Sequence, residues 1–358
     1  MSGENVSNFS QSNLSTVMTT ADEVQTTVTM ATSSSALVDF YFQCLVIAIG
    51  CFGAAANGLI LYGMIASKQH KKQFLIFNQN MLDLASCVVL VVTYSLKLCN
   101  IYHTGTFGYW VCIVVLSGNL IWSTINGSHI NLMSITIERY LKLVHPTYSK
   151  KVLRKWVIYS AAAFAWIAPF AYNLIVVLST SFVKDGVCYG YFSWKNDAVA
   201  VAHGVYYVTS FYIVVICIFV FCYGRILMVI RNQARVMAGH GGPGPSTAQT
   251  HSDRVQTNVI KTMMFVSAFF IITFTPDTAF YTMMTIKPGT SADHIGYHIT
   301  MICAFLYITA NPFIYAVKFD PVRRVLAALM PCTKSQPAGE SVATATIVGI
   351  TRTDQKPN

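Results

Sequence analysis

The sequence predicts an all-α integral membrane protein, built as a bundle of seven transmembrane helices plus a short amphipathic helix on the membrane surface. Two observations lead to this fold class. Hydrophobic residues make up 54% of the 358 residues and charged residues only 11%, a composition too apolar for a soluble chain of this length. The apolar residues also form long continuous runs without the alternation of a strand, and a backbone in lipid must form helices or a closed barrel.

Seven of these runs reach the roughly 20 residues that a helix needs to cross a bilayer. Polar or charged segments separate each run from the next. The predicted spans are 37–65, 74–98, 109–141, 155–179, 199–229, 258–286 and 296–317.

The segment 1–36 precedes the first span and is rich in Ser, Thr and Asn, without Lys or Arg. A cleaved secretory signal begins with a positive region, so we expect a disordered tail followed by an uncleaved first span. The segment holds three Asn-X-Ser acceptors for glycosylation, which requires the tail to be extracellular; chance matches in a Ser-rich segment are the alternative. The acceptors are Asn5, Asn8 and Asn13.

The basic residues predict the orientation. Most of the 24 Lys and Arg residues flank the spans on one side of the membrane, and basic flanks stay cytoplasmic. We therefore expect a multi-pass plasma-membrane protein with its N-terminus outside and its C-terminus in the cytoplasm. The net charge of +10 then faces the inner leaflet and does not indicate nucleic-acid binding.

Two segments on the predicted cytoplasmic side have distinct compositions. Residues 239–246 are rich in Gly and Pro and predict a flexible linker between extended fifth and sixth helices. Residues 321–331 predict the amphipathic surface helix. Cys332 follows it as a candidate for palmitoylation, with an unmodified cysteine as the alternative. The segment 333–358 predicts a disordered cytoplasmic tail.

Polar, aromatic and proline residues stand in a particular order along the spans. They are Asn57, Asp83, Glu138-Arg139-Tyr140, Trp166, Tyr223, Phe270, Pro276, Asn311-Pro312 and Tyr315. This ordered set resembles the signature of rhodopsin-like G-protein-coupled receptors, over about residues 37–330. The resemblance implies a receptor and no enzymatic activity. It implies a heterotrimeric G protein as partner, together with an arrestin and a receptor kinase.

The same residues have physical interpretations. A carboxylate in mid-membrane must be paired, hydrated or bound to an ion, so Asp83 predicts a sodium or water network with Asn57 and Asn311; a satisfied structural cluster is the alternative. No other cofactor is expected. Pro276 and Pro312 remove helix hydrogen bonds and predict hinges.

The end of the third span predicts an activation switch. An ion pair between Glu138 and Arg139 would lock the inactive state, and its rupture would free the arginine for a partner. By the resemblance, helix six moves outward and Arg139, Tyr223 and Tyr315 meet around the opened cleft. Phe274 stands where the family usually has tryptophan, so the switch position keeps an aromatic residue but not the same one.

The resemblance also predicts features of the outer half. The segment 107–112 looks like the loop pattern that leads to the family's disulfide cysteine, with Cys112 bonded to Cys188 and Cys99 as a competing partner. Val215 replaces the usual proline of the fifth span, so we expect that helix to lack its bulge. A buried histidine with satisfied nitrogens is expected at position 129 in preference to a pH sensor.

The usual ligand anchors are missing. The segment from Cys112 to Arg139 is about two residues longer than in the family, so the acid of amine receptors is replaced by Asn119 or Ile121. The seventh span has no lysine above Lys318 for a retinal Schiff base. The chain is therefore expected to be neither an aminergic receptor of the usual kind nor an opsin.

Asp277 follows Pro276 and is placed at ligand depth by the resemblance. It either binds a cationic or hydrogen-bonding group of the ligand or forms a structural pair with Lys97 or His203. The predicted ligand-binding candidates are Lys97, Asn119, Ile121, His203, Asp277, Tyr281 and Met301.

The N-terminal tail is short, which predicts that the ligand is recognised within the bundle and its outer loops. A peptide is the favoured ligand, with a lipid or another small molecule as the alternative. A seven-helix transporter is a remote alternative, because Asp83 and Asp277 make a poor relay of ionisable groups. No catalytic constellation is predicted, and His294 with His298 resembles an ordinary wet helix end more than a metal site.

Overall fold

The computed structural model describes residues 4–99, 104–190, 194, 196–239, 247–286 and 294–318, together with Arg323 and Val325. Side chains are described mainly for 35–99, 104–190, 194, 196–232, 260–286 and 295–313. The predicted surface helix 321–331, Cys332 and the tail 333–358 therefore lie outside the described residues, apart from positions 323 and 325, as do the side chains of the three glycosylation acceptors.

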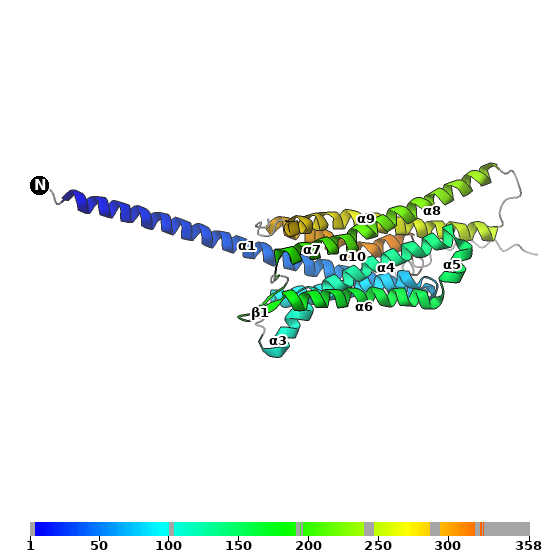
Figure 1. The fold of residues 1–358 in the computed structure, drawn as a ribbon, viewed down its shortest axis with the longest axis horizontal. Helices are drawn as coiled ribbons and strands as arrows, with labels where there is room; N and C mark the ends of the chain where they lie inside the picture. Colours follow the sequence, from blue (N-terminus) through cyan, green and yellow to red (C-terminus); the bar gives the residue numbers. More distant parts are fainter. Residues whose placement is uncertain are drawn as a thin grey trace, which may run out of the picture.

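The described residues form an elongated bundle of seven helical rods that run side by side (Figure 1). Three rods are single helices that agree closely with the predicted spans, α2 (Phe74–Leu98), α6 (Lys155–Thr180) and α10 (His294–Lys318). Two are longer than predicted, α1 (Glu4–Ala66) and α9 (Thr247–Ile286). Two rods consist of three segments each. The third rod is made of α3 (Gly105–Val111), η2 (Cys112–Leu116) and α4 (Asn119–Val144). The fifth rod is made of α7 (Asp197–Val208), η3 (Thr209–Ile213) and α8 (Val214–Gly239).

The apolar composition of the rods supports membrane insertion. Within the described residues, six rods are long and apolar enough to cross a bilayer. The remaining rod, α10, is not among these six over its described residues, and it contains His298, Asn311 and Pro312. The seven-helix membrane bundle predicted from the sequence is confirmed by this arrangement.

The first helix differs from the expected disordered tail. Its backbone is helical from Glu4, so that it projects alone beyond the bundle (Figure 1). Residues 4–49 contain no Gly or Pro, so no residue interrupts the helix that starts in the first span. Only the part from Ser35 onward has the composition of a membrane span.

Two of the rods contain π-helical segments, in which the hydrogen bonds join residues five apart. In η2, the Ser117 amide donates to the Cys112 carbonyl at 2.8 Å. In η3, a second π-helical segment precedes Val214. The fifth span therefore has a bulge without its usual proline, and the prediction from Val215 that it lacks one is wrong. A π segment needs only one extra residue per turn, and proline is not required for it.

The two ends of the bundle carry different structures. At one end lie α3 and a hairpin of β1 (Phe182–Lys184) and β2 (Val187–Tyr189), which we call the disulfide end. At the other end lies α5 (Pro146–Val152), beside the end of α4 that carries Arg139 (Figure 1). We call this the Arg139 end. The rods α8 and α9 extend past it, as predicted, on either side of the predicted linker (Figure 1).

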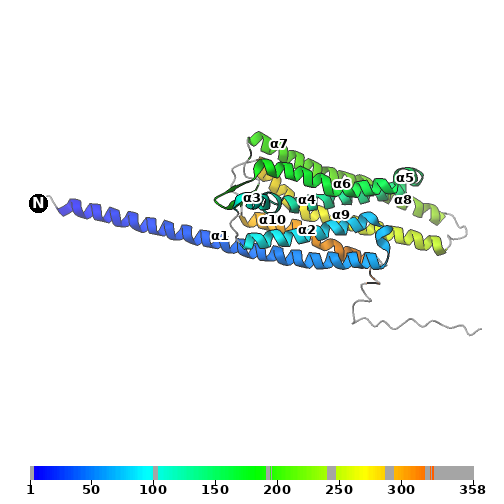
Figure 2. The ribbon, with the colours of Figure 1, turned by 90° about the horizontal axis from the view of Figure 1, so that it is seen from below.

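The rods pack around α4, which lies between α6, α2 and α8. The view from below shows α1 and α2 running alongside each other (Figure 2). Close approach of α4 and α6 depends on Gly127, because a Cβ atom there would lie only 2.4 Å from the Ala165 carbonyl oxygen. Small residues at such contacts allow membrane helices to pack closely. The buried centre includes Phe270, Phe305 and Tyr307.

Candidate functional site

A cavity of about 990 Å³ opens at the disulfide end, between α2, α4, α7, α9 and α10. Its size is at the upper end of the range for small-molecule sites. Six of the seven predicted ligand-binding candidates line it, namely Lys97, Ile121, His203, Asp277, Tyr281 and Met301. The seventh candidate, Asn119, is not among the lining residues. It is fully buried, and its Oδ1 accepts a hydrogen bond from the Ser123 hydroxyl at 3.3 Å.

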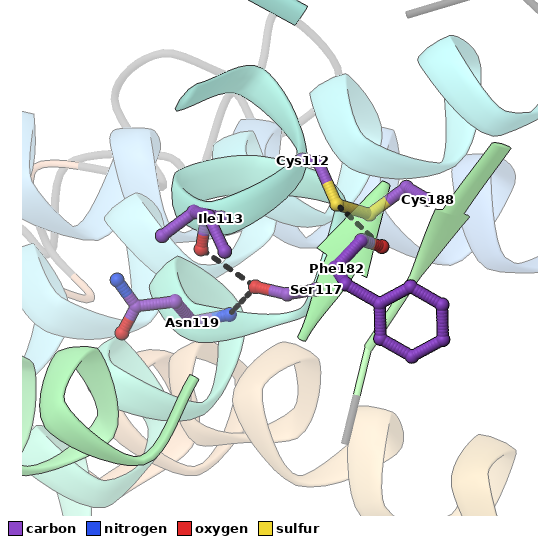
Figure 3. The surroundings of a disulfide bond; sticks show 6 residues. All are labelled: Cys112, Ile113, Ser117, Asn119, Phe182 and Cys188. Carbon is purple, nitrogen blue, oxygen red and sulfur yellow. Dashed lines mark hydrogen bonds between the residues drawn. A yellow bond between two sulfur atoms is a disulfide. The ribbon is translucent and has the colours of Figure 1, made fainter. Parts of the chain in front are cut away.

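The β hairpin borders this cavity because a disulfide ties it to the third rod. The bond joins Cys112 to Cys188, with 5.4 Å between their Cα atoms (Figure 3). Gly190 then packs so closely on the rod that a Cβ atom would lie 3.0 Å from the Ser117 Cα. Cys99 is an exposed free cysteine. The predicted disulfide is therefore confirmed, and the competing partner is not used.

The third rod reaches the cavity through a break at Gly118. This residue has a φ of +84°, in the left-handed region that glycine adopts without strain. The Ser117 hydroxyl there binds back to the Ile113 carbonyl at 2.7 Å (Figure 3). The π turn and the break together absorb the extra length of this rod. Of the two positions left open by counting, the structure places Ile121 at the cavity.

Two charged residues line the cavity without an ionic partner. Lys97 is exposed, and its Nζ lies 5.0 Å from the centre of the Tyr94 ring. Asp277 is half-buried. Among the described residues neither forms an ion pair within 4.0 Å. The structural pairs proposed as the alternative role of Asp277, with Lys97 or with His203, are therefore not formed.

His203 is held by tyrosines instead. Its Nε2 lies 2.8 Å from the hydroxyl of Tyr172, and its Nδ1 lies 3.4 Å from that of Tyr281. The ring also stacks against Tyr172 and lies 4.8 Å from the ring of Trp194. Both nitrogens are thus engaged, which leaves Asp277 as the unpaired polar group at this depth.

A second cavity of about 20 Å³ lies deeper, in contact with the first. The two share Tyr207, Asp277 and Tyr281 in their linings. Asn126 and His129 line the deeper cavity, which has about the room of a single water molecule. We call it the deep cavity.

Asn126 and His129 have unpaired nitrogen atoms. Asn126 is fully buried, and its Oδ1 accepts a hydrogen bond from the Tyr207 hydroxyl at 3.2 Å, while its Nδ2 has no partner. His129 is only 2% exposed, and neither ring nitrogen has a partner among the described residues. The expectation of a satisfied buried histidine is therefore wrong, because aromatic rings occupy the positions of polar partners.

These rings form the aromatic cluster of His129, Phe270, Phe274 and Tyr307. The imidazole centre lies 4.6 Å from Phe270, 4.5 Å from Phe274 and 5.6 Å from Tyr307, in edge-on contacts. Phe270 and Phe274 stack at 5.3 Å. The two phenylalanines of the predicted switch thus pack directly on the third and seventh rods, immediately beside the deep cavity.

Asp83 lies at the centre of a polar network in the middle of the bundle. Its Oδ1 accepts from the Ser128 hydroxyl at 2.7 Å and from the Gln79 amide at 3.4 Å. Its Oδ2 accepts from the Asn311 amide at 2.8 Å. All these groups are fully buried. The predicted contact with Asn311 is formed, and three side chains donate to the carboxylate.

Asn57 does not bind Asp83. Its amide donates to the carbonyls of Gly53 and Ile308, each at 3.0 Å, and so joins α1 to α10. The Oδ1 atoms of Asn57 and Asn311 have no partner among the described residues. Asn311 binds Asp83 directly, and buried oxygen acceptors near a carboxylate can bind a water molecule or a sodium ion. The residues present therefore fit either.

At the Arg139 end, Glu138 is shared between two cations. Its Oε1 lies 2.5 Å from Lys142 Nζ, and its Oε2 lies 3.7 Å from Arg139 Nη2. Arg139 also donates from Nη2 to the side-chain oxygen of Gln73, which precedes α2. The predicted pair is present in a weak form, and Gln73 holds the guanidinium against the second rod.

Tyr223 joins three rods. Its hydroxyl lies 3.0 Å from that of Thr136 in α4 and accepts from Ser267 in α9 at 3.2 Å. The side chain of Tyr315 lies outside the described residues. The meeting of Arg139, Tyr223 and Tyr315 around an opened cleft therefore stays a prediction. Pro276 and Pro312 lie inside their helices, as predicted.

Several residues of these sites were not predicted. The helical spacing gave a signal for two of them, since Gln79 lies four residues before Asp83 and Tyr307 four before Asn311. Ser128, Gln73 and Ser267 carry no such signal, because their partners lie on other rods.

Comparisons with known proteins agree with this geometry. The model of the seven-transmembrane receptor family of the rhodopsin type matches residues 56–315. This is well over half of the chain, and the protein belongs to that family. It is a membrane-spanning receptor of the family rather than an enzyme, as the sequence predicts.

Individual relatives are distant. The chain is 23% identical to Melanopsin-B of Gadus morhua over 80% of its own length and 47% of that protein, so it spans about half of this relative. It is 24% identical to G-protein coupled receptor 15 of Mus musculus and 23% identical to C-C chemokine receptor type 8 of Homo sapiens, each over 82% of this chain and 79% of the relative.

A crystal structure of squid rhodopsin matches the fold with a TM-score of 0.68. The identity is 16%, over 82% of this chain and 85% of the rhodopsin chain. This likeness confirms the seven-helix bundle.

Proposed function

We propose that this receptor transmits the binding of an extracellular ligand, a peptide, to a cytoplasmic heterotrimeric G protein at the plasma membrane. The observation that carries the proposal is that one bundle holds a ligand-sized cavity at the disulfide end and Arg139 at the opposite end. The aromatic cluster and the Asp83 network lie between them. The N-terminus is outside in this proposal, and arrestin and a receptor kinase are further partners.

The shape and lining of the cavity support a peptide. Its volume of about 990 Å³ accommodates several residues. Aromatic and methionine side chains line it, and Lys97 and Asp277 offer one charge of each sign. One relative named above, C-C chemokine receptor type 8, is by its name a receptor for chemokines, and this supports a peptide by analogy. A lipid or another small molecule remains the alternative ligand.

Activation in this proposal moves α9 outward at the Arg139 end. Movement of α9 separates Ser267 from Tyr223 and frees the phenol. Arg139 must also leave Gln73 and Glu138 to face a partner. Tyr223 and Arg139 then become available at the same opening, next to Tyr315.

The Asp83 network supplies a further element of the proposal. We infer that it binds ordered water and admits a sodium ion, with the free Oδ1 atoms of Asn57 and Asn311 as the additional oxygen ligands. Replacing sodium chloride by choline chloride should lower the melting temperature of the purified receptor. The Asp83→Asn variant should lose this dependence, and a retained dependence would place the ion elsewhere.

The central test is the Arg139→Ala variant in a reconstituted G-protein nucleotide-exchange assay. Candidate peptides are first screened in cells for G-protein dissociation, and an active peptide is then applied to purified receptor. We expect Arg139→Ala to abolish ligand-driven exchange, with Arg154→Ala as the control, because Arg154 is an exposed arginine outside the switch. Exchange that persists in Arg139→Ala at normal expression contradicts the assignment.

A further inference from the structure

The deep cavity lies between three rods, and its lining includes Asn126, His129 and Asp277 around a space the size of one water molecule. Asn126 and His129 lie one turn apart on α4, and Asp277 faces them from α9. Asn126 and His129 are nine-tenths or more buried and have unpaired nitrogen atoms there. Unpaired buried polar groups cost free energy unless a partner occupies the space between them. The cavity is therefore built for a polar occupant.

The number and kind of acceptors define the occupant. Asp277 offers a carboxylate oxygen, and a neutral His129 offers one ring nitrogen. Turning the Asn126 amide presents its oxygen to the cavity, while its nitrogen then donates to the Tyr207 hydroxyl. Three residues of the lining then offer an acceptor. An ammonium group has three donors and no acceptor, so it satisfies all three residues at once.

Charge and size agree with this occupant. The carboxylate of Asp277 has no cation beside it among the described residues, and an intramembrane carboxylate is strongly favoured by one. The volume of about 20 Å³ admits a group of the size of water. A planar guanidinium or a trimethylated amine exceeds it. The connection with the large cavity lets a ligand chain extend outward past Tyr207 and Tyr281.

We propose that the deep cavity is the ammonium subsite of this receptor, with Asn126, His129 and Asp277 as its acceptors. The inference rests on the proposed function, since it assumes a ligand in the large cavity. It specifies that ligand as a molecule with a primary amine at its inner end. A peptide that enters with a free N-terminus has this chemistry, and an acidic group further out then lies toward Lys97.

The test uses one set of lysine-free tetrapeptides with aromatic and aliphatic side chains in three forms: free N-terminus, N-acetylated, and N-trimethylated. The trimethylated form keeps the charge but has no donor and is larger. Thermal unfolding of the purified full-length receptor reports binding. We expect the free form alone to raise the melting temperature, by about 5 °C at saturating concentration. Equal shifts with the acetylated or trimethylated forms would overturn the proposal.

Variants of the receptor show which residues cause the rise in melting temperature. Asp277→Asn and Asn126→Leu should each remove the shift, while Ser134→Ala, a change on α4 outside the linings of both cavities, should keep it. Lys97→Met should leave the preference for a free N-terminus intact. A free-amine preference that survives Asp277→Asn would place the subsite elsewhere.

A second probe separates this proposal from the peptide assignment. If no peptide form shifts the melting temperature, the peptide ligand of the proposed function fails. Methylammonium chloride and tetramethylammonium chloride, compared at equal ionic strength, then test the subsite itself. Stabilisation by methylammonium alone, lost in Asp277→Asn, supports it. Equal behaviour of the two salts overturns it.

Discussion

Two carboxylates lie inside the bundle, and their surroundings are opposite. Asp83 accepts hydrogen bonds from three residues on three rods, whereas Asp277 has no hydrogen-bond or ionic partner among the described residues. The polar groups around Asp83 thus join rods. In the half toward the disulfide His203 also joins rods, but Asp277 faces the two cavities. The comparison indicates that Asp83 maintains a conformation and that Asp277 awaits a ligand.

The largest expected effect is a difference in stability between variants of the two aspartates. Asp83→Ala leaves the donors of Ser128, Gln79 and Asn311 buried and unpaired, and we expect it to lower the free energy of unfolding by about 3 kcal/mol. Asp277→Ala should leave the stability of the ligand-free receptor unchanged or raise it, because an unpaired carboxylate is removed. Thermal unfolding of both purified variants measures the difference. Similar losses in the two variants would remove the basis of the comparison.

A smaller effect is expected at Tyr223. Its hydroxyl joins α4 to α9 through Thr136 and Ser267, so Tyr223→Phe should lower the free energy of unfolding by about 1 kcal/mol. The same loss should raise ligand-independent nucleotide exchange, because α9 is released. Tyr159→Phe is the matched control, since Tyr159 is 53% exposed. Unchanged basal exchange in Tyr223→Phe would show that this contact does not hold α9.

A substitution at His129 should raise the free energy of unfolding, in contrast to Asp83→Ala and Tyr223→Phe, which should lower it. Its unpaired nitrogens lie among aromatic rings, so His129→Leu should raise the free energy of unfolding of the ligand-free receptor by up to about 1 kcal/mol. Phe270→Leu in the same cluster removes packed ring atoms and should lower it. Both changes are read from melting temperatures. A loss of stability in His129→Leu comparable to that in Phe270→Leu would mean that the histidine has a structural partner.

The smallest effect concerns the shared Glu138. The Lys142 side chain is 40% exposed, so Lys142→Met should change the free energy of unfolding by less than about 0.5 kcal/mol. Its effect should be on activity instead. With Lys142 removed, Glu138 pairs with Arg139 alone, and basal nucleotide exchange should fall. Lys150→Met is the control, and a rise of basal exchange in Lys142→Met would contradict the competition between the two cations.

The parts of this structure that follow from local composition were predictable. Apolar runs fixed the helical rods to within a few residues for α2, α6 and α10, because bilayer thickness sets their length. The disulfide followed from the resemblance to the receptor family, and the buried position of Asp83 followed from a carboxylate within an apolar run. Six ligand-binding candidates meet at one cavity, since they lie in the outer parts of five rods.

The parts that depend on contacts between rods were not predictable. Gln73, Ser128 and Ser267 are ordinary polar residues until another rod brings Arg139, Asp83 or Tyr223 beside them. The bulge in the fifth rod was missed for a related reason. Proline is one cause of such a bulge, but the backbone forms η3 without it. The unpaired state of His129 likewise results from the rings packed around it.

The π turn of η2 and the left-handed Gly118 have a consequence for how the third rod tolerates changes in length. Two residues added to a continuous helix would rotate everything beyond them by more than half a turn. Here the irregular segment takes up the excess locally, so Ser128, Glu138 and Arg139 keep their facing toward neighbouring rods. Insertions in this segment can therefore reshape the outer wall of the receptor while its transducing machinery stays in register.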